Sequence, residues 1–102
     1  MGNIDNEQHG ELIRILDELV EVITARRKEE KEFLLVQHER EAKEWNAFLR
    51  GHTDKEELIS LRDEIVDRFF YKYDVQIGDM EVDKRRLELM EEYLSKSYEF
   101  LK

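Results

Sequence analysis

The sequence predicts an all-α protein, folded as an antiparallel bundle of helices. Apolar residues recur every three to four positions along most of the chain, which is the period of a helix with one buried face. The 102 residues include no proline and only four glycines, so long stretches contain nothing that stops a helix. A chain of this length has room for one core, and we assign residues 1–102 to a single domain.

The first helix is expected over residues 7–50, after a flexible segment at residues 1–6. The apolar face of its first half is wider than a two-stranded coiled coil needs, so it should contact two neighbours. Residues 25–32 carry alternating charges but consist of good helix formers, and Gly51 supplies a natural stop. We favour a continuous helix and hence three helices in all, whereas a break near residues 25–32 would give four.

The second helix is expected over residues 54–73. Thr53 and Asp54 each precede a glutamate by three residues, which is the pattern of a helix N-cap. Arg62 interrupts the apolar face, and we expect it to reach a carboxylate on a neighbouring helix. The main stripe of this helix consists of Leu58, Leu61, Ile65 and Phe69.

The last helix is expected over residues 80–101. Gly78 lies in a short loop before it, and Asp79 is placed to cap its first turn. Its expected apolar stripe consists of Leu87, Met90, Leu94, Tyr98 and Leu101, and it is widened by Leu89, Tyr93 and Phe100.

The composition limits the classes of partner. The chain has 17 basic and 26 acidic residues, a net charge of -9, and its basic clusters are flanked by carboxylates, so we expect no direct contact with nucleic acid. Without cysteine it has neither disulfides nor thiolate metal sites. The longest apolar runs are four residues, so we expect no membrane contact and a cytoplasmic protein.

No specific catalytic motif is present. The three histidines lie far apart and none has the spacing of a metal ligand, so we assign no catalytic residue and no cofactor. Two segments do pair carboxylates one helical turn apart, Glu18 with Glu21 and Glu64 with Asp67. Carboxylates facing each other in this way are ligands suited to Mg²⁺.

These acidic segments, Ile15–Ala25 and Glu64–Phe70, resemble the paired motifs of the MazG-like all-α nucleoside triphosphate pyrophosphohydrolases. The resemblance implies an Mg²⁺-dependent enzyme whose metal ligands are Glu18, Glu21, Glu64 and Asp67. The other interpretation is that acidic residues opposite an apolar stripe form the solvated side of a helix. We favour that interpretation and keep the enzyme as an alternative.

Aromatic residues give the leading functional hypothesis. Several cluster at helix ends and point around most of the circumference, so not all can face one core. Aromatic side chains are enriched where proteins bind each other. We therefore predict a non-enzymatic interaction or regulatory module, forming a homodimer and binding another protein through Trp45, Phe48, Phe70, Tyr71 and Tyr73. A further alternative is an acidic inhibitor that mimics nucleic acid, which requires rows of carboxylates on one face.

Overall fold

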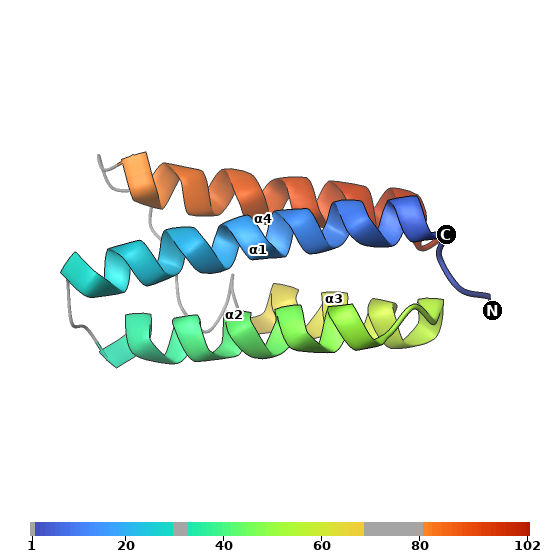
Figure 1. The fold of residues 1–102 in the computed structure, drawn as a ribbon, viewed down its shortest axis with the longest axis horizontal. Helices are drawn as coiled ribbons and strands as arrows, with labels where there is room; N and C mark the ends of the chain where they lie inside the picture. Colours follow the sequence, from blue (N-terminus) through green and yellow to red (C-terminus); the bar gives the residue numbers. More distant parts are fainter. Residues whose placement is uncertain (1, 30–32, 69–80) are drawn as a thin grey trace.

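In the computed structural model, residues 2–29, 33–68 and 81–102 are described, and they form four helices and no strand (Figure 1). The helices are α1 (Asn6–Glu29), α2 (Phe33–Gly51), α3 (Lys55–Val66) and α4 (Glu81–Phe100). Consecutive helices run in opposite directions, and the molecule measures 41 × 23 × 21 Å. The predicted all-α antiparallel bundle is confirmed.

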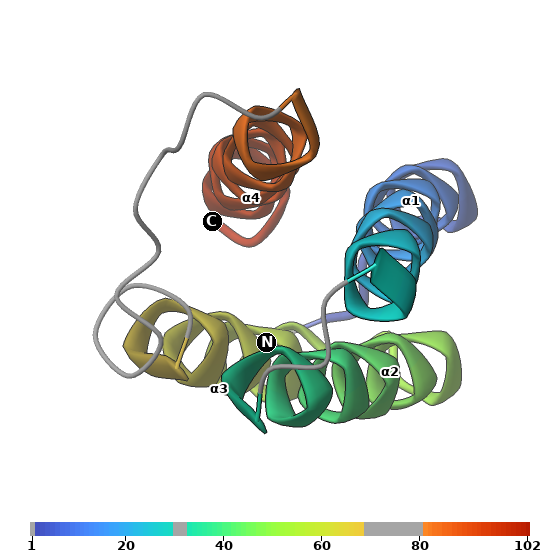
Figure 2. The ribbon, with the colours of Figure 1, turned by 90° about the vertical axis from the view of Figure 1, so that its left-hand side faces the viewer.

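The preference for one continuous helix over residues 7–50 is wrong, and the four-helix alternative is observed. α1 and α2 lie side by side and pack along their length (Figure 2). A straight helix would leave the apolar stripes of both halves in water, whereas the antiparallel pair buries both in one core. The favourable burial of these stripes outweighs the helix propensity of the charged segment between them.

α1 makes the most extensive contacts with other helices. It packs closely against both α2 and α4, whereas α3 touches α2 and α4 more sparsely. This arrangement explains the wide apolar face predicted for its sequence, because that face contacts two neighbours. Five of its side chains have no exposed surface: Leu12, Ile15, Leu16, Leu19 and Ile23.

The connection between α2 and α3 is held by the N-terminal segment. The backbone N–H of Ile4 donates to the carbonyl of Thr53, and that of Lys55 donates to the carbonyl of Gly2, both at 3.0 Å. The Ile4 side chain is buried in the core. Residues 2–4, which the sequence assigned to a flexible segment, thus brace the start of α3. Asp54 caps that helix by accepting from the N–H of Glu57 at 3.2 Å, as its sequence predicts.

The buried face of α4 agrees with the predicted apolar face except at Tyr98. Leu89, Met90 and Tyr93 are fully buried, whereas Tyr98 is 55% exposed. The guanidinium of Arg62 on α3 lies 4.1 Å from the centre of the Tyr98 ring. Arg62 therefore covers an aromatic ring on the neighbouring helix, and its ion-pair partner among the described residues is Asp63 of its own helix, 3.9 Å away, instead of the carboxylate that we expected on a neighbouring helix.

None of the helices, over the residues that the structure describes, is both long enough and apolar enough to cross a membrane.

Candidate functional site

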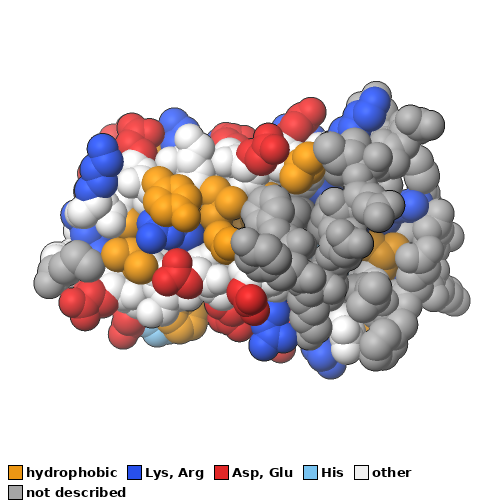
Figure 3. Space-filling view, turned by 180° about the vertical axis from the view of Figure 1, so that it is seen from behind, with side chains coloured by type: hydrophobic (Ala, Val, Ile, Leu, Met, Phe, Trp, Pro, Cys, Tyr) orange, Lys and Arg blue, Asp and Glu red, His pale blue; other side chains and the backbone are white. Residues whose placement is uncertain are grey.

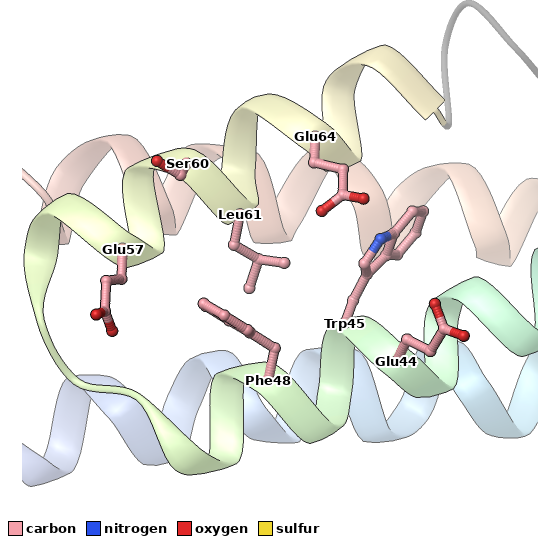
Figure 4. A pocket seen from close by; sticks show the side chains of 7 residues that line it. All are labelled: Glu44, Trp45, Phe48, Glu57, Ser60, Leu61 and Glu64. Carbon is pink, nitrogen blue, oxygen red and sulfur yellow. The ribbon is translucent and has the colours of Figure 1, made fainter.

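A groove of about 280 Å³ lies between α2 and α3 (Figure 4). The two helices run antiparallel, and each contributes one face to the groove. Its volume is at the lower limit of the roughly 300–1,000 Å³ of typical small-molecule sites, which suits it to one or two side chains of a partner. The lining residues are Glu44, Trp45 and Phe48 from α2, and Glu57, Ser60, Leu61 and Glu64 from α3.

The floor of the groove is apolar. Trp45 and Leu61 are 3% and 4% exposed, so they form the boundary between the groove and the core. Phe48, one turn after Trp45, is 36% exposed and stands at the opening (Figure 4). Both aromatic residues were among the predicted contact residues, and the structure brings them to the same site.

His52 supports the exposed ring of Phe48. The two rings stack with their centres 3.8 Å apart and their planes 8° from parallel. Nδ1 of His52 lies 2.7 Å from the carbonyl oxygen of Phe48 and donates to it when it carries a hydrogen. Nε2 lies 3.7 Å from the Glu57 carboxylate, and the two form an ion pair when the ring is protonated. The ring of Phe48 is thus held in place before any partner arrives.

The rim of the groove is acidic. Glu44, Glu57 and Glu64 are all exposed, and two of them lie on α3 with Leu61 between them. Among the described residues no basic side chain forms an ion pair with Glu44 or Glu64. At one end the two helices are joined by Arg68, which follows α3 and lies 3.7 Å from Glu41 of α2. Between that ion pair and His52, the three glutamates give the groove a negative potential.

Three other residues were predicted as partner contacts, and these lie outside the described residues: Phe70, Tyr71 and Tyr73. Sequence reasoning missed the α3 side of the groove, although its four residues share one helical face at positions i, i+3, i+4 and i+7. That spacing was a signal, but only the pairing of α3 with α2 shows that this face lines a groove.

The carboxylates of the metal-binding alternative are not gathered into one site. Glu18 accepts a hydrogen bond from Arg85 of α4, and Glu21 lies on the surface of the same helix. Glu64 and Asp67 belong to α3 and its end, and Figure 2 shows α1 and α3 at opposite corners of the bundle. Within the described part of the chain, no group of three or more potential ligands could hold a metal ion.

The surface formed by α3 and α4 does not show the rows of carboxylates that a nucleic-acid mimic needs. Seen from that side, acidic, basic and apolar side chains are interspersed over the described part (Figure 3). Tyr98 and Arg62 belong to this mixed surface.

Buried ionisable groups lie behind the groove. The ring of His38 packs edge-on against Trp45, with ring centres 6.1 Å apart. Burial, together with the positive charge of Arg86, lowers the pKa of His38 to about 3, so its ring is neutral at ordinary pH. Burial also raises the pKa of the Tyr93 hydroxyl, against the opposing effect of Arg62. These groups are enclosed in the bundle, away from any approaching ligand.

Comparisons with protein families, with curated proteins and with solved structures find no significant match to this chain. The groove itself is therefore the basis for assigning a function.

Proposed function

We propose that the protein is a non-enzymatic interaction module that binds another protein through the groove between α2 and α3. The observation that carries this proposal is an exposed, preformed aromatic ring, Phe48, above an apolar floor and inside a rim of exposed glutamates. Aromatic anchors of this kind dominate binding energy at protein interfaces. The acidic rim selects a partner that carries lysine or arginine beside its apolar side chain.

The acidic rim also bears on the expected homodimer. In a symmetric dimer each subunit uses the same patch, so pairing through this groove would bring like-charged glutamates together. Glu44 and Glu64 have no cation of their own to relieve that repulsion among the described residues. The partner of the groove is therefore a different chain, and a homodimer would use another surface. Light scattering of wild-type protein and of a Phe48→Asp variant checks this: loss of a dimer in the variant alone would contradict it.

The proposal is tested with two matched variants of α2. Phe48→Asp puts a charge in the groove, whereas Val36→Asp puts the same charge on an exposed apolar residue of the same helix that does not line it. Proteins retained from the native host by wild type are identified by mass spectrometry and then bound individually to each variant. We expect one partner that no longer binds the Phe48→Asp variant but still binds the Val36→Asp variant. Circular dichroism should show that both variants are equally helical. A partner that binds all three proteins alike would rule out the groove as the contact surface.

A further inference from the structure

The glutamates of α3 have a spacing that a second helix can match. Glu57 and Glu64 are seven residues apart, which is two helical turns and about 10.5 Å along the axis. Ser60 and Leu61 lie halfway between them and on the same face (Figure 4). The α3 side of the groove therefore presents negative charge, an apolar centre, and negative charge again, in that order.

The α2 side of the groove has a complementary layout. Trp45 and Phe48 lie opposite Leu61 and complete the apolar centre, while Glu44 adds a carboxylate at the same end as Glu64 (Figure 4). The groove opens to solvent between the Arg68–Glu41 ion pair and His52, so a helix lying across its opening can place side chains in it. An amphipathic helix in such a groove makes contact through residues at i, i+3, i+4 and i+7.

The carboxylates of the groove rim differ from those at the contact between α1 and α4. There, Glu11 pairs with Lys96 and Glu18 with Arg85, so their charges are already compensated within the chain. Glu44 and Glu64 have no such cation in the described residues, and Glu57 faces only His52. Lysine or arginine side chains of a partner would form new ion pairs with these carboxylates, whose positions are fixed by α2 and α3.

From this arrangement, and resting on the proposed function, we infer the chemistry of the partner segment. It is a helix with lysine or arginine at two positions seven residues apart, and with one or two large apolar side chains halfway between them. The cations pair with Glu57 and Glu64, and the apolar side chains enter the groove over Leu61, Trp45 and Phe48. Both helices then match in their period, so the charges and the apolar centre align together.

Trp45 provides a direct readout, because it is the only tryptophan of the chain and lines the groove. The probe is a synthetic alanine-based helix of about twenty residues, long enough to be helical, with lysine at i and i+7 and leucine at i+3 and i+4. Its control peptide has the same composition, with the second lysine moved two positions onward to the opposite face of the helix. We expect a saturable change in Trp45 fluorescence, with about threefold weaker binding of the control peptide, as the loss of one exposed ion pair implies.

Two double variants separate local from overall charge. Glu57→Gln with Glu64→Gln removes both rim charges of α3, whereas Glu91→Gln with Glu99→Gln removes two exposed charges from α4. Because both change the net charge equally, simple long-range attraction would affect them equally. We expect the peptide to bind the first variant at least about tenfold more weakly and to bind the second like wild type.

Three results would overturn the inference. Equal binding of the two peptides would show that the spacing is not recognised. Equal weakening by the two double variants would show general attraction between opposite charges. An equal response of Trp45 to spermidine would identify a site for small organic cations. If the peptides fail but a host partner still depends on Phe48, the proposed function stands and this inference falls. If that partner does not depend on Phe48, the proposed function itself fails.

Discussion

The carboxylates at two helix contacts of the bundle, α1 with α4 and α2 with α3, have different surroundings. Along the seam between α1 and α4, Arg14 lies 2.8 Å from Glu92 and Lys96 lies 3.5 Å from Glu11, so charges of both signs bridge the helices. Along the seam between α2 and α3, the glutamates of the groove rim lie beside an apolar opening. The first seam is thus bridged by ion pairs, whereas in the second the exposed glutamates lie between the Arg68–Glu41 ion pair and His52.

This difference follows from how closely the helices pack. α1 touches α4 along its length, which brings long side chains from both within reach of each other. α3 is the shortest helix described and makes sparser contacts with α2, and there the described ion pairs lie at the ends of the groove, Arg68 with Glu41 and His52 with Glu57. An apolar surface beside exposed carboxylates is typical of a place where a partner binds, which is the basis of the proposal for this seam.

The largest expected effect tests whether the groove is separate from the core. Leu19 of α1 is fully buried, and Leu19→Ala should destabilise the protein by about 2–5 kcal/mol through lost burial and a cavity. Phe48→Ala, at a partly exposed side chain, should cost about 1 kcal/mol or less. Urea unfolding followed by circular dichroism measures both. Equal costs would mean that Phe48 belongs to the core and is not available to a partner.

The next effect concerns pH and the interior behind the groove. Burial lowers the pKa of His38 to about 3, from an unfolded value near 6.5, so below pH 6.5 the unfolded state binds a proton that the folded state does not. Stability is therefore retained above pH 6.5 and falls progressively toward pH 3. Between pH 7 and pH 5 this residue should cost about 2 kcal/mol.

The matched variant for this pH effect is His38→Gln, which cannot be protonated. Urea unfolding at the two pH values should show the loss in wild type and about 2 kcal/mol less of it in the variant. The same pH dependence in both proteins would show that His38 is not responsible. Binding of a partner at the groove is measured separately from this stability effect, because the groove rim lies at the surface whereas His38 is buried.

The fold was largely readable from the sequence, but the number of helices was not. The period of apolar residues predicted the buried stripe of α1, and Asp54 and Gly51 predicted the start of α3 and the end of α2. The end of α1 at Glu29 has no such local signal, because residues 25–32 are good helix formers. The end of α1 is determined by packing between apolar stripes that lie far apart in the sequence. A single sequence does not show which helices become neighbours.

The candidate site was readable only in part for the same reason. Trp45 and Phe48 were predicted because large aromatics on a charged helix are conspicuous on their own. The three rim glutamates look like any solvated residues until the antiparallel register sets Glu44 of α2 across from the face of α3. The exposure of Tyr98 shows the same limit, since its contact with Arg62 depends on both helices.

A smaller effect is expected from Tyr93, on the face of α4 that meets the core. Its hydroxyl is buried and has no hydrogen-bond partner among the described residues. Tyr93→Phe removes a polar group that is desolvated without compensation, and should stabilise the protein by up to about 1 kcal/mol. Tyr98→Phe, at an exposed ring, is the control and should change little. A loss of stability in Tyr93→Phe would mean that the hydroxyl makes a bond that matters.

The smallest effect is the most direct test of the two seams. Glu92→Gln breaks the ion pair with Arg14 and should cost about 0.2–1 kcal/mol, less at high salt, as exposed pairs do. Glu64→Gln should be neutral or slightly stabilising, because this carboxylate has no cation among the described residues and lies near the C-terminal end of α3, where negative charge is unfavourable. Parallel urea titrations in low and high salt give the sign of each change. If both substitutions cost the same, the glutamates of the groove already have partners within the chain, and an open acidic rim no longer distinguishes the two seams.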